Sequence, residues 1–149
     1  MNTEALLKSL KEHDVRFVVI GATAFPVHGY SRATLDIDIF IKPDGINASK
    51  TLKALGAFGY DVADISVKDL LTKKLLIRQY IVETDIHPFV KGIGFETVWK
   101  HKVRARFGRT VVYFASLKDI IKMKRAAGRP KDREDLRYLV RLDKMKKER

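Results

Sequence analysis

The segment 35–41, with the sequence LDIDIFI, constrains the fold of this chain more than any other stretch. Its residues alternate strictly, with four aliphatic side chains on one face and Asp36, Asp38 and Phe40 on the other. A strand rises by about 3.4 Å per residue, so the two carboxylates lie about 7 Å apart at the backbone. The pattern predicts a strand that buries one face and presents two acids on the other.

Two interpretations of Asp36 and Asp38 are open at this level. Alternating strands with one solvated face are common, and both acids are then ordinary surface residues. Aspartate is disfavoured in strands, however, and two carboxylates at neighbouring same-face positions repel each other unless a positive charge lies between them. A divalent cation bound by oxygen ligands removes that repulsion, so the pair is a candidate metal site.

A glycine follows the apolar segment 16–20, which is predicted to be a buried strand. Gly21 permits a sharp turn into a helix that starts near Ala22 or Thr23 and extends to Gly29. The N-terminus of a helix presents free N–H groups and a positive dipole end, both suited to phosphate. A phosphate site beside two aspartates is the arrangement needed to hold a nucleoside triphosphate through Mg²⁺.

The residues from Gly21 to Asp38 contain Gly-Ala-Thr-Ala, then His-Gly, Arg-x-Thr and Asp-x-Asp. This pattern resembles the signature of the nucleotidyltransferase superfamily, which has the DNA polymerase β-like fold. It is most similar to the small prokaryotic branch that includes AbiEii-type toxins and minimal nucleotidyltransferases. That branch usually has Gly-Gly or Gly-Ser at the first pair. This chain has Ala22 there, so a serine hydroxyl that would contact phosphate is missing.

The resemblance covers most of the chain and implies its architecture. We expect an α+β fold with a mixed sheet of about four to five strands and helices packed mainly on one face. Residues 1–149 are expected to form a single nucleotidyltransferase-like domain, which is consistent with their length. The tail, residues 143–149, is expected to fray.

A third carboxylate is implied on a later strand, and Asp85 fits this position. It lies in the segment 75–89, whose alternation predicts one strand with Glu83, Asp85 and His87 on the same face. Asp85 must share the face of the first two aspartates, and Glu83 is its competitor. A single aspartate in a strand is usually solvated, and His87 is better explained as a strand-end histidine than as a site residue.

The resemblance also implies roles for individual residues. Two Mg²⁺ ions would be held by the catalytic acids, which are Asp36, Asp38 and Asp85. Lys124 aligns with a lysine that the family places near the nucleotide phosphates, although a helical lysine is most often solvated surface. Arg32 is expected to pair with an anionic substrate or with one of the first two acids. The candidate nucleotide-binding residues are Gly21, Ala22, Arg32, Thr34 and Lys124.

Composition sets broad limits on the class of protein. The chain has 30 basic and 18 acidic side chains, a formal net charge of +12, and no cysteine. Without cysteine there are no disulfides or thiolate metal sites, and we expect a cytoplasmic location. Because neither a span of about 18 apolar residues nor a signal-peptide pattern is found, we expect no membrane partner. The positive charge favours nucleotides or nucleic acid as partners, but a generic lysine-rich protein has the same composition.

Capping and turn signals predict the remaining elements. We expect helices over residues 3–13 with Thr3 as cap, from an Asn47 cap to residue 58, and after caps at Ser66 and Ser116. A last helix is expected over 131–147, with structural ion pairs from its two N-terminal aspartates to Arg129 or Arg133. The basic run 100–109 is either a charged edge hairpin or a surface that follows RNA phosphates. Residues 110–114 are predicted to form the last strand.

Three functions from different classes are compatible with these residues. The leading hypothesis is Mg²⁺-dependent transfer of a nucleoside monophosphate from an NTP to a hydroxyl on RNA such as tRNA, on a protein or on a small molecule. By resemblance, such an enzyme would be a toxin that has an antitoxin partner. The alternative is a catalytically degenerate nucleotide- or RNA-binding module. The third is a basic RNA-binding protein whose acids are structural, with salt-dependent RNA affinity.

Overall fold

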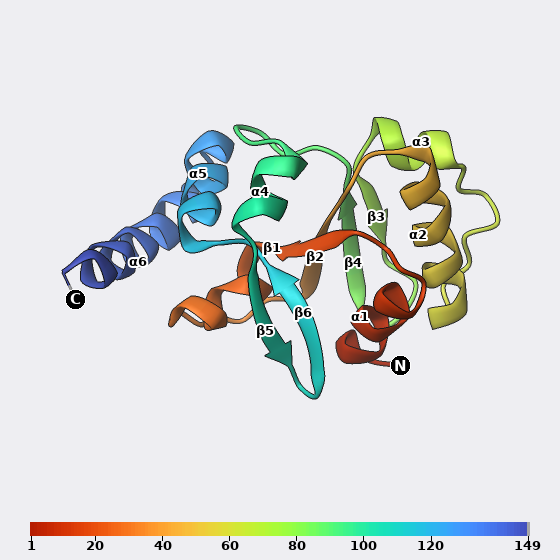
Figure 1. Cartoon of the computed structure of the whole chain (residues 1–149), viewed down its shortest axis with the longest axis horizontal. Coiled ribbons are helices and arrows are strands. Elements are labelled where there is room, and N and C mark those ends of the chain that lie inside the picture. Colours follow the sequence, from red (N-terminus) through yellow and green to blue (C-terminus); the bar gives the residue numbers. More distant parts are fainter. Residues whose placement is uncertain (149) are drawn as a thin grey trace.

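The structure, a computed structural model, describes residues 1–148 as a six-stranded mixed sheet with six α-helices and one 3₁₀ helix (Figure 1). The strands are β1 (Phe17–Ile20), β2 (Asp36–Ile41), β3 (Leu75–Ile77), β4 (Glu83–His87), β5 (Val103–Phe107) and β6 (Thr110–Phe114). The helices are α1 (Thr3–Glu12), η1 (Gly21–His28), α2 (Gly45–Phe58), α3 (Val67–Thr72), α4 (Phe95–His101), α5 (Leu117–Ala127) and α6 (Pro130–Lys147). The expected α+β class is therefore confirmed.

The strand order is β3-β4-β2-β1-β6-β5. β1 lies antiparallel to β2, whereas β2 is parallel to β4 and β1 is parallel to β6. The two strands that carry the predicted site, β2 and β4, are therefore neighbours near the middle of the sheet. In Figure 1, α5 and α6 (blue) lie at the opposite end of the molecule from α2 and α3.

The expected strand count of four to five was wrong, mainly because the segment 75–89 is not one strand. It forms the antiparallel pair β3 and β4, with the chain reversing between Arg78 and Val82. The reversal contains neither glycine nor proline, so it lacks the usual turn signals. The side chain of Gln79 holds it in place by hydrogen bonding to both the N–H and the carbonyl of Asp61, at 2.7 and 2.8 Å.

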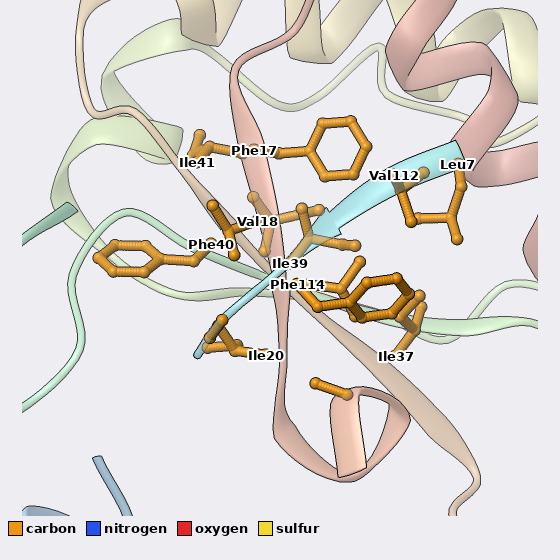
Figure 2. Close-up of a cluster of buried hydrophobic side chains, with 14 of the residues drawn as sticks. Leu7, Phe17, Val18, Ile20, Ile37, Ile39, Phe40, Ile41, Val112 and Phe114 are labelled. Atoms are coloured by element: carbon orange, nitrogen blue, oxygen red, sulfur yellow. The ribbon is translucent and has the colours of Figure 1, made fainter. Parts of the chain in front are cut away.

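One face of the sheet is aliphatic. Ile39 and Ile41 of β2 pair with Val19 and Phe17 of β1, so all four side chains leave the same face and are buried. Figure 2 labels Phe17, Ile39 and Ile41 of this cluster together with Leu7, which α1 contributes. The predicted burial of one face of β2 is confirmed, except that Leu35 precedes the strand and is 86% exposed.

The opposite face carries the acids at one end and an aromatic contact at the other. Phe40 of β2 packs edge-on against Phe95 of α4, with the ring centroids 5.3 Å apart. Helices therefore lie on both faces of the sheet, in contrast to the arrangement expected from the resemblance. Among residues 1–148, none of the helices has both the length and the apolar composition needed to cross a bilayer.

Two helix starts differ from the prediction by one or a few residues. Asn2, rather than Thr3, caps α1 by accepting a hydrogen bond from an N–H of its first turn. Asp44, rather than Asn47, caps α2, because the side chain of Asn47 is engaged with the backbone of Arg16 at the start of β1. Asn47, a residue type that often caps helices, therefore links α2 to the start of β1 instead.

Two other helix starts agree with the prediction, whereas one helix was missed. Ser66 forms the expected capping box with Asp69, and Ser116 caps α5. The short helix α4 was missed, since its first turn follows Gly94 and has no side-chain cap. The last helix continues to Lys147, into the segment that was expected to fray.

Candidate metal centre

The register of β2 and β4 brings two of the predicted acids directly together. Asp38 pairs with Asp85 across the parallel ladder, and Asp36 pairs with Glu83 one step earlier. Because side chains at paired positions leave the same face, all four carboxylates lie on the side of the sheet opposite the aliphatic core. Parallel pairing of two strands that the sequence separates by about forty residues is the tertiary contact that creates this site.

His87 joins this pair at the end of β4. Its Nε2 lies 2.7 Å from Asp38 Oδ1, a hydrogen-bond distance. Asp38, Asp85 and His87 each offer one donor atom, and these three atoms lie within 4.8 Å of one another. Asp36 is not part of this group. The structure therefore brings together two of the three predicted metal ligands and replaces the third with a histidine.

Asp85 is the most buried of these groups, with 4% of its surface exposed. Arg78 Nη1 lies 2.7 Å from its Oδ1, and Lys74 Nζ lies 3.8 Å from its Oδ2. The same Nη1 hydrogen-bonds to the carbonyls of Ile77 and Thr84. Oδ1 consequently has an ionic neighbour but no well-aligned hydrogen-bond donor among residues 1–148.

The backbone at Gly21 is shaped around Asp38. Gly21 has φ +70°, in the left-handed region that side chains rarely adopt, and a Cβ added there would lie 2.4 Å from Asp38 Oδ2. Only glycine lets β1 turn into the following helix while the carboxylate of Asp38 rests against the turn. The role of Gly21 in the turn was predicted from the sequence, but its contact with Asp38 was not.

The segment after Gly21 is a 3₁₀ helix, η1, in place of the helix expected from Ala22 to Gly29. Pro26 lies inside it and has no N–H, so an α-helical hydrogen bond to Ala22 cannot form. His28 is buried and its Nε2 lies 2.8 Å from the carbonyl of Ala115, as expected for a packed histidine. Burial lowers the pKa of His28, since its environment disfavours the charged imidazolium.

A cavity of about 330 Å³ opens beside Gly21, Asp38 and His87. Its wall includes apolar side chains from β1, α5 and the segment after β4, such as Phe89 and Ile120. Its basic residues are Lys74, Lys91, Lys124 and Arg129. A concave site with an apolar wall and several cations is suited to an anionic ligand that carries a flat apolar group.

A second cavity, of about 420 Å³, is lined by Ala22, Arg32, Thr34 and Asp36. The hydroxyl of Thr34 donates to the carbonyl and to Oδ1 of Asp36, at 3.1 and 3.3 Å. The candidate nucleotide-binding residues are therefore divided between two cavities, with Gly21 and Lys124 in one and the other three in the second.

Arg32 does not pair with either strand acid, as one alternative had it. Its Nε and Nη2 hydrogen-bond to the two carboxylate oxygens of Asp135 on α6, at 2.8 and 3.0 Å. The hydroxyl of Tyr30 donates to the same carboxylate at 3.3 Å. Burial raises the pKa of Asp135, but the hydrogen bond from Arg32 and the charge of Lys124 outweigh it and lower the pKa below its usual value.

Lys124 is likewise held by protein groups. Its Nζ lies 3.0 Å from Asp132 Oδ1 and 3.2 Å from Asp135 Oδ2. Arg129 donates to Asp132 from its backbone and its side chain, which confirms the predicted pairing of that aspartate. Burial raises the pKa of Asp132, but the hydrogen bonds from Arg129 and Lys124 prevail and hold the pKa at about 2. We call Arg32, Lys124, Arg129, Asp132 and Asp135 the α5–α6 ion cluster.

Sequence reasoning missed two residues of the site. His87 was considered but assigned to the strand end, although its position two residues after Asp85 on one strand face was the available signal. Arg78 was not considered, because its place beside the acids depends on the chain reversal between β3 and β4. No local pattern in the sequence indicates that contact.

The donor set of Asp38, Asp85 and His87 suits a divalent cation. Carboxylate oxygens serve Mg²⁺ and Mn²⁺ alike, and an imidazole nitrogen suits transition metals better than Mg²⁺. Oδ1 of Asp85 lies 2.7 Å from Arg78 Nη1, and a carboxylate with two oxygens still has lone pairs for a further ligand. Among residues 1–148, this is the one group of three or more acidic or histidine donors close enough to share an ion.

Comparison of this sequence with protein-family models and with curated proteins found no match. The resemblance to nucleotidyltransferases therefore stays a prediction, and the functional proposal below depends on the geometry of the site.

Proposed function

We propose that this chain is a nucleotidyltransferase, which moves a nucleoside monophosphate from an NTP to an acceptor hydroxyl. The observation that supports this most is the pairing of Asp38 with Asp85 beside the Gly21 turn, where Asp38 lines a cavity that also has four basic residues. Such a pair holds a divalent cation next to the phosphates of a nucleotide, and the resemblance from Gly21 to Asp38 points to the same chemistry.

The cavity beside Asp38 takes the nucleotide. Lys74 and Lys91 line it and balance the charge of a triphosphate, and Phe89 gives its base an apolar surface. η1 begins at Gly21, which lines this cavity, and the first N–H groups of a helix have no partner within the helix, so they suit phosphate. A divalent cation at Asp38 and Asp85 would neutralise charge on the phosphates and on the leaving pyrophosphate.

The second cavity takes the acceptor. Asp36 lines this cavity, while Asp38, two residues on, lines the first, so an acceptor hydroxyl beside Asp36 lies next to the nucleotide. Asp36, whose side chain is 34% exposed, accepts the proton of that hydroxyl. The acceptor oxygen then bonds to the α-phosphorus, and the bond to pyrophosphate breaks with its electron pair leaving on pyrophosphate. A net charge of +12 suits an RNA acceptor such as tRNA. We also include a protein as an acceptor, and an antitoxin as a binding partner, in this proposal.

The experiment is incubation with each labelled NTP and Mg²⁺ or Mn²⁺, with tRNA, total cell protein and the chain itself as acceptors. We expect label to appear on one acceptor class and to be lost with Asp38→Asn. Asp64→Asn is the matched control, because Asp64 is exposed on the loop between α2 and α3. Equal transfer by Asp38→Asn and by the wild type contradicts the proposal.

A second candidate function is nucleotide binding without transfer. The observation that favours it is the internal pairing of three cations, since Arg32, Lys124 and Arg129 already contact aspartates of α6. Saturable, metal-dependent NTP binding with no label transfer to any acceptor class would support this candidate over the enzyme.

A further inference from the structure

The guanidinium of Arg78 lies among three carboxylates of the acid face. Its nitrogen atoms are 2.7 Å from Asp85 Oδ1, 3.7 Å from Asp36 Oδ2 and 3.7 Å from Glu83 Oε2. These acids come from both strands of the β2–β4 ladder, and Arg78 reaches them from the chain reversal that precedes β4.

Asp85 belongs to two groups of charged side chains at once. On one side it lies with Asp38 and His87, whose donor atoms are close enough to share an ion. On the other side it lies with Asp36 and Glu83 around the guanidinium. The acid face thus has two adjacent cation positions that share one buried carboxylate, and one of them is filled by a side chain of the protein.

We propose that Arg78 is a built-in counter-charge at the second cation position, so that the site takes one divalent ion and not the two expected from the sequence. The inference rests on the proposed function, because it concerns the cation of that same site. A guanidinium placed there balances Asp36, Glu83 and Asp85 without a metal, and the single ion binds through Asp38, Asp85 and His87.

The contacts of Arg78 explain why a metal can replace it. Its side chain is 40% exposed. Two of its three ion pairs, those with Asp36 and Glu83, are 3.7 Å long, and exposed pairs of this kind contribute little to stability. Only the contact with Asp85 is short, and Oδ1 of that residue still lacks a well-aligned donor among residues 1–148. Removing the guanidinium leaves Asp36, Glu83 and Asp85 around this position. Their oxygens must then move closer together to share an ion, since among residues 1–148 only the donors of Asp38, Asp85 and His87 are already close enough.

The test counts bound Mn²⁺ by electron paramagnetic resonance titration of the wild type and of Arg78→Gln. We expect one tightly bound ion in the wild type and two in Arg78→Gln. Arg78→Lys keeps a cation at this place and is expected to bind one. Arg106→Gln removes the same charge from an exposed position on β5 and is also expected to bind one, which separates a local effect from a change in net charge.

Two ions in the wild type, or one in Arg78→Gln, overturn the inference. If Arg78→Gln does not fold alone, it is refolded with Mn²⁺, and two bound ions are then required. A variant that stays unfolded with Mn²⁺ also overturns the inference, since Arg78 would then be a residue that metal cannot replace. Absence of label transfer by a wild type that binds one ion contradicts the proposed function alone, and absence of ions in both proteins contradicts both.

Discussion

Two of the regions that contain buried aspartates differ in how these carboxylates are paired. In the α5–α6 ion cluster, Asp132 and Asp135 are almost fully buried, and each accepts aligned hydrogen bonds from cationic side chains. On the acid face of the sheet, Asp85 is 4% exposed, and the nearest cation, Arg78, is 40% exposed and is shared with Asp36 and Glu83.

This difference separates a structural role from a functional one. A buried carboxylate that is fully paired fixes the position of two helices, and its removal leaves unpaired cations. A buried carboxylate that is incompletely paired retains acceptor capacity for a ligand, and a folded protein seldom leaves such a group without a reason. In the proposed function, the chemistry therefore belongs to β2 and β4, and the α5–α6 ion cluster mainly holds α6 and the segment around Arg32 against α5.

The largest expected effect is loss of transfer in Asp85→Asn. The variant removes one of the proposed ligands of the cation, so the transfer rate should fall by about 100-fold to 1,000-fold, the range found for loss of one electrostatic group in an active site. Its free energy of unfolding should change by only about 1 kcal/mol, because Arg78 keeps two other acids and is partly exposed. Label transfer and urea unfolding of the same preparation measure both quantities. If Asp85→Asn transfers label as fast as the wild type, Asp85 has no functional role and the contrast with the α5–α6 ion cluster is wrong.

Asp132→Asn should show the opposite pattern, with stability as the main loss. The substitution leaves Arg129 without its carboxylate and Lys124 with only one, in a region where Asp132 itself is 0% exposed. We expect a loss of about 3 kcal/mol in the free energy of unfolding, the lower end of the range for breaking a buried ion pair. The unfolding curve in urea, compared with that of Asp64→Asn, gives the value. A loss below about 1 kcal/mol contradicts the structural role.

Acid should weaken the α5–α6 ion cluster over a defined pH range. The pKa of Asp132 is lowered to about 2 in the folded chain from the value of 3.8 expected without the fold. A lowered carboxyl pKa stabilises the fold above about pH 4, and this contribution is lost as the pH falls toward 2. The contribution is on the order of 2 kcal/mol. The stability difference between wild type and Asp132→Asn should narrow between pH 5 and pH 2.5, and a difference that stays constant contradicts this assignment.

The smallest effect is expected for Gly21→Ala. The new Cβ meets Asp38 Oδ2 and forces a positive φ on alanine, which costs about 1–2 kcal/mol of stability. The displaced carboxylate should also weaken Mn²⁺ binding. Gly45→Ala is the matched control, because Gly45 has no atom of another residue within 4 Å of its added Cβ in the described chain and no positive φ. Equal stability and equal Mn²⁺ affinity of both variants contradict the proposed contact of Gly21 with Asp38.

The sequence predicted those parts of the fold and site that depend on local patterns. Alternation located β2 and the face of its acids, and the caps at Ser66 and Ser116 located two helices. The phase of β4 also placed Asp85 on the same face as Asp38, given that the strands are neighbours. Each of these features is set by residues within about ten positions of one another.

The parts that could not be predicted depend on contacts between distant segments. The reversal at Arg78 has no turn residue to mark it, and it is held by Gln79 against the backbone of Asp61. Arg32 lies about a hundred residues before α6 in the sequence, yet it contacts Asp135, as Lys124 of the neighbouring helix α5 also does. Long, flexible cationic side chains choose their partners in three dimensions, so an arginine or lysine in a motif does not by itself indicate a ligand contact.

The central claim is that Asp38 and Asp85 form a cation site, and Mn²⁺ titration of the wild type beside Asp38→Asn tests it most directly. Asp64→Asn controls for the loss of one negative charge. The account predicts one saturable ion in the wild type and in Asp64→Asn, and loss of saturable binding in Asp38→Asn. Equal binding by Asp38→Asn and the wild type would contradict it.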